Sequence, residues 1–413
     1  MESTPMDLPR MRATALRAFE IGVAAAAPDD AVREALGRKP GSHSAPIIIA
    51  VGKAAGRMMQ AALEVYPAPK SALVVTNPEN AQPIAGATVM AAAHPVPDQA
   101  GLEAGAEVLK RLSQAEAGDE VLALISGGGS ALLPAPVQGV TLADKAAVSA
   151  ALLGSGADIQ DMNLVRQNLS RLKGGGFLQA AQPAHVRALI LSDVVGDDLR
   201  VIASGPTVSP LGSQSEARKI LQDRGLWKEM PASVRAHLTG SAPARPHLDA
   251  ENELIGSNAI SRAAMAKAFP QAHVMTQDLD GDVRVAAETL AEWADGAGMW
   301  ICGGETTVQL KGTGVGGRNQ ELALHLARAA QRRGWERPWV YLQGGTDGRD
   351  GPCDAAGAIV DHTTLQRIAA KGGDIKRLLD NNDSYAALGM ADDLLMTGGT
   401  GTNVADLGIL IRG

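Results

Sequence analysis

Short aliphatic runs alternate with longer amphipathic stretches through the first half of the chain. The runs are apolar at nearly every position, and they span residues 46–51, 71–76, 88–93, 120–125 and 186–192. Strands that are apolar on both faces are typical of a parallel sheet covered by helices on both sides. The amphipathic stretches between the runs predict those helices, including one near the N-terminus. We therefore expect residues 1–235 to form a Rossmann-like α/β domain with a mostly parallel sheet.

The pattern changes in the second half. Residues 231–250 are rich in Pro, Ser, Gly and His, a composition typical of a domain boundary. Beyond this segment we expect strands at residues 254–256, 273–276, 299–302, 307–311, 339–342, 358–361 and 407–411. Several of these runs alternate apolar and polar residues, which indicates a mixed sheet with an exposed face or edge. The prediction is a second α/β domain over residues 250–413.

Composition narrows the class of protein. A chain of 413 residues with 45% hydrophobic and 20% charged residues is typical of a folded, two-domain globular protein. A net charge of −7 and an aromatic content of 3% argue against nucleic acid as a partner. Two cysteines, Cys302 and Cys353, are too few for a disulfide framework and fit a reducing, cytoplasmic location. No run reaches the roughly 18 apolar residues that a membrane span needs.

Two glycine-containing turns follow buried strands of the first half. Gly52 and Lys53 open a helix after the first run, where backbone N–H groups and a cation could hold a phosphate. The alternative is a glycine turn with a solvated lysine. The fourth run leads into successive glycines whose N–H groups could form an anion nest, although such a loop can also be a plain tight turn. The residues of this loop are Ser126, Gly127, Gly128, Gly129 and Ser130.

A polar stripe and an acid also come from the first half. Asn163, Arg166, Ser170 and Lys173 share one helical face, which is usually a solvated face, but a triple glycine ends the segment. Asp193 directly follows the fifth run. A carboxylate in that position suits Mg²⁺ bound together with nucleotide phosphates, or a base for a substrate hydroxyl, or simply the cap of a turn.

The second half contains several glycine-rich segments. Residues 312–317 match G-x-G-x-x-G, the pattern of a dinucleotide-binding loop. The run before them, 307–311, alternates in polarity, whereas the first strand of a Rossmann fold is buried on both faces. Arg318 begins the next helix and could neutralise charge on a transferring phosphoryl group. Residues 344–352, with Asp347, and 397–403 could approach phosphates or a metal, but each alone is typical of a surface loop.

Taken together, these segments resemble the glycerate 2-kinase family, whose C-terminal half is called the MOFRL domain. The resemblance covers nearly the whole chain, and it is specific because the segments occur as an ordered set. They are VGKAAGRM, HPVPDQAG, ISGGGSALL, NLVRQNLSRLKGGG, SDVVGDD, ASGPT, GGETTVQLKGTGVGGRNQELAL, GGTDGRDGPCDAAGA, LDNNDSY and TGGTGTNVADL. Two departures are visible, Gly399 where relatives usually have proline and Cys353 where threonine is frequent.

The resemblance implies an activity and a set of residues. We expect ATP and Mg²⁺ to serve the phosphorylation of D-glycerate to 2-phosphoglycerate in a cleft between the two domains. The essential lysine and arginine of the family fall on Lys53 and Arg318, and we add Asp193 as a third catalytic residue. The residues expected to bind substrate or phosphate are Ser126, Gly127, Gly128, Gly129, Ser130, Arg166, Lys173, Glu305 and Asn319. Asp193 and Asp347 are the expected ligands of Mg²⁺.

Two alternatives remain at this point. The first is an NAD(P)H-dependent hydroxypyruvate reductase, a name that some relatives have carried, with the cofactor on residues 312–317. The second is a non-catalytic sensor of a phosphorylated metabolite. The expected partners are glycerate and ATP, with neither nucleic acid nor membrane, and a homodimer is left open.

Overall fold

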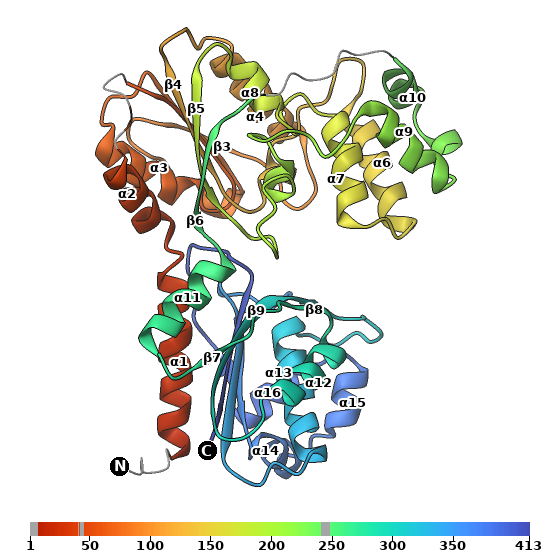
Figure 1. The fold of residues 1–413 in the computed structure, drawn as a ribbon. Helices are drawn as coiled ribbons and strands as arrows, with labels where there is room; N and C mark the ends of the chain where they lie inside the picture. The colour runs from red at the N-terminus through yellow and green to blue at the C-terminus, as the bar shows by residue number, and fades with distance from the viewer. Residues whose placement is uncertain (1–6, 40, 42–44, 241–247) are drawn as a thin grey trace. The chain divides into compact units, whose positions relative to one another are not determined.

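The computed structural model describes residues 7–39, 41, 45–240 and 248–413 (Figure 1). The chain divides into two compact units. The first unit runs from Pro28 to Ile255, and the second combines the segment up to Ala27 with Gly256–Gly413. Both units are α/β, so the expected fold class is confirmed. The division differs from the expected boundaries of 1–235 and 250–413 because the N-terminal helix packs with the C-terminal sheet.

The first unit is built on a six-stranded sheet in the order β3-β2-β1-β4-β5-β6. The pairs β1–β2, β1–β4, β2–β3 and β4–β5 are parallel. Their bounds are β1 Ile47–Val51, β2 Ser71–Thr76, β3 Thr88–Ala91, β4 Glu120–Ile125, β5 His185–Leu191 and β6 Glu251–Gly256. In this order the winding reverses between β1 and β4, and ligands of such sheets bind beyond the carboxyl ends of the strands at that point.

Helices cover both faces of this sheet. On one face α4 (Gln99–Leu112) and α8 (Gly176–Ala181) pack against alternate residues of β1. On the other face lie α2 (Pro28–Arg38) and α3 (Ala55–Val65) (Figure 1). The residues 254–256, which we expected in the second sheet, belong to β6 of this one.

A helical lobe stands beside the sheet within the first unit (Figure 1). It has an apolar core of its own, which includes Val148, Leu152, Val165, Leu221 and Val234. Its helices are α6 Leu142–Gly154, α7 Ile159–Asn168, α9 Gln214–Asp223 and α10 Ala232–Thr239. The helix α7 ends at Asn168, so Ser170 and Lys173 lie in the turns after it. The expectation of one helical face from 163 to 173 was therefore wrong in its second half.

The second unit contains a seven-stranded mixed sheet, as expected. Its order is β12-β11-β10-β13-β9-β7, with β8 paired to β9. The pairs β9–β13, β10–β13 and β10–β11 are antiparallel, whereas β7 and β8 run parallel to β9. The bounds are β7 His273–Val274, β8 Leu279–Asp282, β9 Gly298–Thr307, β10 Trp339–Gly345, β11 Gly357–Asp361, β12 Leu394–Leu395 and β13 Asp406–Arg412.

Two details of this sheet differ from the sequence-based expectation. Residues 308–311 form no strand, because β9 continues to Thr307 and a loop follows. The strand β8 was not expected, since Leu279–Asp282 contains a single apolar residue and is held by pairing with the end of β9. Backbone pairing with a strand that is remote in sequence therefore holds β8, and no hydrophobic pattern in its own residues could predict it.

Alternate residues of the strands face two helical layers. On one face α1 (Leu8–Ala24) and α11 (Asn258–Ala268) cover Ile301, Leu342 and Ile409, which confirms the amphipathic N-terminal helix. The other face, with Trp300, Tyr341 and Leu410, is covered by a second group of helices (Figure 1). They are α12 Val283–Trp293, α13 Arg318–Arg332, α14 Thr364–Ala370, α15 Ile375–Asp380 and α16 Ser384–Ala391. Within the described ranges no helix has the length and apolar character needed to cross a bilayer.

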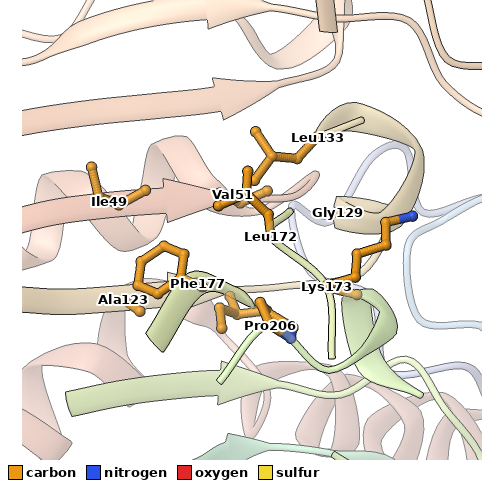
Figure 2. A pocket seen from close by; sticks show the side chains of 11 residues that line it. Ile49, Val51, Ala123, Gly129, Leu133, Leu172, Lys173, Phe177 and Pro206 are labelled. Atoms are coloured by element: carbon orange, nitrogen blue, oxygen red, sulfur yellow. The ribbon is translucent and has the colours of Figure 1, made fainter. Parts of the chain in front are cut away.

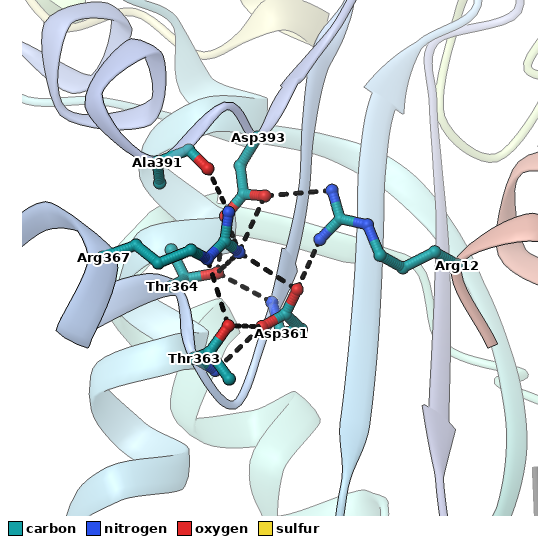
Figure 3. Close-up of polar contacts among 7 residues, drawn as sticks. All are labelled: Arg12, Asp361, Thr363, Thr364, Arg367, Ala391 and Asp393. Carbon is teal, nitrogen blue, oxygen red and sulfur yellow. Dashed lines mark hydrogen bonds and ion pairs between the residues drawn. The ribbon is translucent and has the colours of Figure 1, made fainter. Parts of the chain in front are cut away.

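The helix α1 is fixed to its sheet by a buried ionic network (Figure 3). Arg12 donates to both Asp361 and Asp393, and Arg367 of α14 donates to the same two carboxylates. The side chains of Asp361 and Asp393 are 2% and 0% exposed, so neither acid can rely on water for its charge. Two guanidinium groups thus balance two buried carboxylates, and one of them comes from the far N-terminus.

Removing the N-terminal cation should destabilise the second unit. We predict that Arg12→Ala lowers its free energy of unfolding by about 1–3 kcal/mol, because Arg367 is left to balance two buried acids. Urea unfolding followed by tryptophan fluorescence reports this unit, which contains Trp293, Trp300, Trp335 and Trp339 of the five tryptophans. Arg17→Ala, an exposed change on the same helix, is the control. Equal midpoints for the two variants would contradict the role of the network.

Candidate functional site

The turns that follow β1 and β4 are tied together beyond the ends of the strands. Ser126 N–H donates to Val51 O at 2.9 Å, and Lys53 N–H donates to Gly127 O at 2.9 Å. Ala54 N–H donates to Ser126 Oγ at 3.1 Å. A Cβ at position 52 would lie 2.2 Å from Ser126 Oγ, so glycine is required there. These bonds hold Lys53 and the glycine loop side by side at the point where the winding reverses.

The glycine loop presents free backbone donors. Within the part of the chain that the structure describes, the N–H groups of Gly127, Gly128, Gly129 and Ser130 donate to no protein acceptor. Gly128 adopts a left-handed conformation, with φ of 84°, which lets the chain curl. Consecutive N–H groups without an acceptor among the described residues are typical of a concave anion nest, and anion binding by this loop stays a prediction.

Asp193 lies directly against this loop. It follows β5, the parallel neighbour of β4. A Cβ at position 127 would lie 2.1 Å from Asp193 Oδ2, so the carboxylate fills the space that a side chain at Gly127 would take. Of the two later acids in the same segment, Asp198 forms an ion pair with Arg200. The carboxylate nearest the loop is thus the one expected from its position at the strand end.

Lys173 and Ser130 connect the glycine loop to two other segments. Lys173 Nζ donates to Ser130 O and Ser130 Oγ, both at 2.8 Å. Ser130 Oγ lies 2.9 Å from Ser204 Oγ, which donates to Asn163 Oδ1 at 2.9 Å. Ala203 and Ser204 have φ of 49° and 62°, a left-handed conformation that is unfavourable for both residue types. The segments NLVRQNLSRLKGGG and ASGPT therefore support one site together with the loop.

Figure 2 shows what lies beneath the loop. An apolar void of about 20 Å³ is lined by Ile49, Val51, Leu133 and Phe177, among others, and bordered by the stem of Lys173. The ammonium group of Lys173 points away from these apolar side chains (Figure 2). The apolar contacts thus hold the stem while the charged end reaches the loop.

Three cations line a larger cavity next to the loop. Lys145 of α6, Arg166 of α7 and Lys173 surround a space of about 510 Å³ that also touches Gly128 and Ser130. Lys145 donates to Leu169 O at 2.9 Å, and Arg166 Nε donates to Ser149 Oγ at 3.3 Å. In the described ranges no carboxylate forms an ion pair with Lys145 or Arg166. Lys145 and Arg166 therefore bring positive charge to the cavity without an ion-paired carboxylate among the described residues.

The pKa values of the basic residues that line the cavity are lowered. Burial lowers the pKa of Lys145 to about 7, with a smaller contribution from Arg166. Burial also lowers the pKa of Arg166, and burial together with Lys145 and Arg166 lowers the pKa of Lys173 well below its usual value. At the mouth, burial and the nearby charge of Lys53 lower the pKa of His94. An anion in this cavity would relieve the repulsion and raise these values.

In the second unit, Arg318 is held rigidly by two carboxylates. It is the first residue of α13, and its Nε and NH2 donate to Asp406 at 2.6 and 3.1 Å. Its NH1 lies 2.8 Å from Glu305 Oε1, at the end of β9. Burial opposes the charge of Arg318, but Asp406 and Glu305 raise its pKa overall. NH1 and NH2 each keep a second hydrogen that a ligand could accept.

The N-terminus of α13 is already occupied by a carboxylate. Asp350 accepts from the N–H groups of Asn319 and Gln320, at 3.1 and 2.9 Å. Burial raises the pKa of Asp350 to about 6 in spite of these bonds. The amide of Asn319 is 1% exposed and lies between Gln343 and Asp350. The side chain of Asn319 thus supports Asp350, and the ligand contact that we expected for Asn319 stays a prediction.

The glycine-rich loop before Arg318 serves packing. The N–H groups of Lys311 and Gly312 donate to Asn382 Oδ1 at 2.7 and 3.0 Å, and Thr313 N–H donates to Asn381 Oδ1 at 3.1 Å. A Cβ at Gly312 would lie 2.3 Å from Asn381 O. The glycines of the G-x-G-x-x-G pattern therefore allow close approach to the segment 381–384. The N–H groups bonded to this segment are not free to bind a dinucleotide.

The acids of the second unit surround Arg318. Burial and the charges of Asp406 and Asp347 raise the pKa of Glu305 despite Arg318 beside it. Asp347 Oδ1 accepts Arg349 N–H at 3.0 Å. No group of three or more His, Cys, Asp or Glu suited to a metal is found among the described residues. Mg²⁺ commonly binds one or two carboxylates plus substrate phosphates. Asp193 in the first unit and Asp347 in the second each offer carboxylate oxygens of this kind, and their role as Mg²⁺ ligands stays a prediction.

Two residues of these clusters were missed in the sequence. Lys145 lies in a helix of mostly small residues. Its place in a basic cluster becomes visible only in the fold, where Arg166 and Lys173 line the same cavity from other segments. Asp406 begins the last apolar run of the chain, where an acid is unremarkable until β13 brings it to Arg318. A lone lysine in an alanine-rich helix was the one available signal for the first residue.

Comparison with known proteins agrees with the sequence resemblance. Residues 14–239 match a family described as a domain of unknown function, DUF4147, and residues 298–406 match the MOFRL family. The D-glycerate 2-kinase of Thermotoga maritima is 40% identical over 97% of this chain and 98% of its own length. A protein of Agrobacterium vitis with the provisional name hydroxypyruvate reductase is 37% identical, over 96% of this chain and 93% of its own.

A solved structure extends the similarity to the fold. The crystal structure of glycerate kinase from Thermotoga maritima superposes with a TM-score of 0.89 at 39% identity, covering 97% of this chain and 99% of that chain. The similarity therefore covers both α/β units, including the mixed second sheet, and not one shared domain alone. The chain belongs to the glycerate kinase family with DUF4147 and MOFRL domains.

Proposed function

We propose that this protein transfers the γ-phosphoryl group of ATP to the 2-hydroxyl of glycerate. Relatives over nearly the full length bear the names D-glycerate 2-kinase and glycerate 2-kinase. The observation that carries the proposal is the set of N–H groups at Gly127–Ser130, beside Lys53, that have no acceptor within the described ranges. Such a set can hold a phosphate in a chain whose net charge of −7 would otherwise repel it.

The proposed reaction is a direct, in-line transfer. The 2-hydroxyl oxygen of glycerate bonds to the γ-phosphorus, the bond to the β–γ bridging oxygen breaks, and ADP leaves with the bond's electron pair. The amides at Gly127–Ser130 and the Lys53 ammonium group stabilise charge on the phosphoryl oxygens. Arg318, fixed by Glu305 and Asp406, contacts transferring phosphate or the glycerate carboxylate. Positioning and charge neutralisation supply most of the acceleration in such transfers.

Asp193 has one of two roles in this proposal. It either accepts the proton of the 2-hydroxyl or serves as a ligand of Mg²⁺, with Asp347 as the second candidate ligand. When bound, Mg²⁺ supplies neutralisation of phosphate charge. The contact of Asp193 with Gly127 supports either role, because it sets the carboxylate at the edge of the phosphate nest.

The geometry disfavours the two alternatives. A reductase would need free amides at residues 312–317, and those of Lys311–Thr313 are bonded to Asn381 and Asn382. A sensor would need neither the acid beside the nest nor a cation held between Glu305 and Asp406. The kinase uses each of these features, so it is the better account of the residues.

Two substitutions test the proposed cations. Lys53→Met and Arg318→Ala should each lower kcat for ADP release in the presence of glycerate and Mg²⁺ by at least ~100-fold, because each removes charge that stabilises the transition state. Arg332→Ala, which breaks an exposed ion pair on the same helix as Arg318, is the control and should keep its rate. A near-normal kcat in either test variant would remove that residue from the mechanism.

A third substitution separates the two roles of Asp193. We expect Asp193→Asn to lower kcat by ~100-fold or more. If the carboxylate binds Mg²⁺, the Mg²⁺ concentration for half-maximal rate should also rise several-fold; if it accepts the proton, that concentration should stay the same. Initial rates over a Mg²⁺ titration provide the measurement. A variant with unchanged kcat and Mg²⁺ dependence would exclude Asp193 from the site.

A further inference from the structure

We propose that the cavity between α6, α7 and residues 94–97 is the nucleotide subsite, with the adenosine on its apolar wall and the phosphates on Lys145, Arg166, Lys173 and the glycine loop. This assignment rests on the proposed kinase function, and it adds Lys145 and the exposed face of α6 to the site. It also assigns the first unit to ATP.

The size of the cavity favours the larger of the two substrates. A volume of about 510 Å³ lies within the range of about 300–1,000 Å³ that holds a drug-sized ligand. Glycerate is a three-carbon acid and would leave most of this space to water. A nucleoside triphosphate has the dimensions to reach from an apolar wall to the loop at Gly128 and Ser130.

One face of α6 forms a continuous wall. Lining residues recur at the spacing of a helix, and they are Leu142, Lys145, Ala146, Ser149, Ala150 and Leu153. The buried residues Val148 and Leu152 of the same helix face the lobe core instead. Leu153 is 69% exposed, an unusual position for a large aliphatic side chain. Small residues flanked by leucines leave a flat apolar surface suited to a planar base.

A second segment that lines the cavity is also apolar. Pro95, Val96 and Pro97 follow His94 and line the cavity from the end of β3. Val96 is 69% exposed. Two apolar walls, each with an exposed aliphatic side chain, thus bound the space beside the cations.

Charge gives the same assignment. In the described ranges neither Lys145 nor Arg166 forms an ion pair with a carboxylate, so these two groups alone exceed the single charge of glycerate, whereas a triphosphate has enough charge for both. Around Arg318, by contrast, Glu305, Asp350 and Asp406 outnumber the cation. A polyphosphate is therefore better accommodated in the first unit than at Arg318.

Filling the apolar half tests the assignment. Ala150 is exposed and lines the cavity, and Ala147 is exposed on the same helix outside the lining. We expect Ala150→Phe to weaken binding of ATP and of adenosine at least tenfold while tripolyphosphate binds as before. Ala147→Phe should leave all three unchanged. Isothermal titration calorimetry of the full chain gives the affinities, and circular dichroism confirms that both variants fold.

The cationic half is tested by Lys145→Met. We expect at least tenfold weaker binding of ATP and tripolyphosphate, with adenosine unchanged, and a raised KM for ATP at constant KM for glycerate. The assignment is overturned if Ala150→Phe leaves ATP binding unchanged, or if Lys145→Met raises KM for glycerate alone. Failure of the kinase proposal would be a separate result, in which the wild-type protein releases no ADP with glycerate. The ATP affinities of the variants would still show whether the nucleotide binds in this cavity.

The pH dependence of anion binding gives a second measurement. The lowered pKa of Lys145, about 7, means that its charge is present below pH 7 and lost as the pH rises through that value. Arg166, Lys173 and His94 are the other titratable groups lining the cavity. Sulfate, which does not titrate in this range, should raise the melting temperature more at pH 6.5 than at pH 8.5, with chloride of equal ionic strength as the control. Lys145→Arg should remove most of this difference, and an unchanged difference would contradict the role of Lys145.

Discussion

Three hydrogen bonds between the turns after β1 and β4 set the geometry on which the proposed site depends. They join Ser126 to Val51 and Ala54, and Lys53 to Gly127, at the carboxyl ends of the two strands. The loop amides that follow, from Gly127 to Ser130, find no acceptor among the described residues. The same contact leaves no room for a side chain at position 52. The positions of Lys53 and of the glycine loop are thus set by the hydrogen bonds at the carboxyl ends of β1 and β4.

The proposed phosphate site is compatible with an acidic chain. The net charge of −7 belongs to the whole chain, whereas Lys145, Arg166 and Lys173 bring basic side chains together in one cavity. Burial lowers the pKa of each of these groups, so the cations are costly when no anion is bound. The second unit shows the opposite balance, with acids surrounding Arg318. An anion bound in the first unit would stabilise the charged forms of these buried basic groups.

Much of this could be predicted from the sequence, for a physical reason. Strands buried on both faces are apolar throughout, so residues 46–51 and 120–125 identified their own ends and with them Lys53, Ser126 and the loop glycines. What the sequence could not show depends on remote partners. The amphipathic pattern of the N-terminal helix does not reveal which sheet the helix covers, and the place of Asn319 beside Asp350 is set only in the folded unit. Lys145 likewise gains its role from helices that meet only in the folded lobe.

The central claim is that the loop at the end of β4 holds the phosphates of ATP. A crystal structure of the full chain with a non-hydrolysable ATP analogue, Mg²⁺ and glycerate tests it most directly. The account predicts phosphate oxygens within hydrogen-bond distance of the N–H groups of Gly127–Ser130. It also predicts that Lys53 contacts those oxygens. Phosphates bound elsewhere, with the amides of this loop still unpartnered, would contradict it.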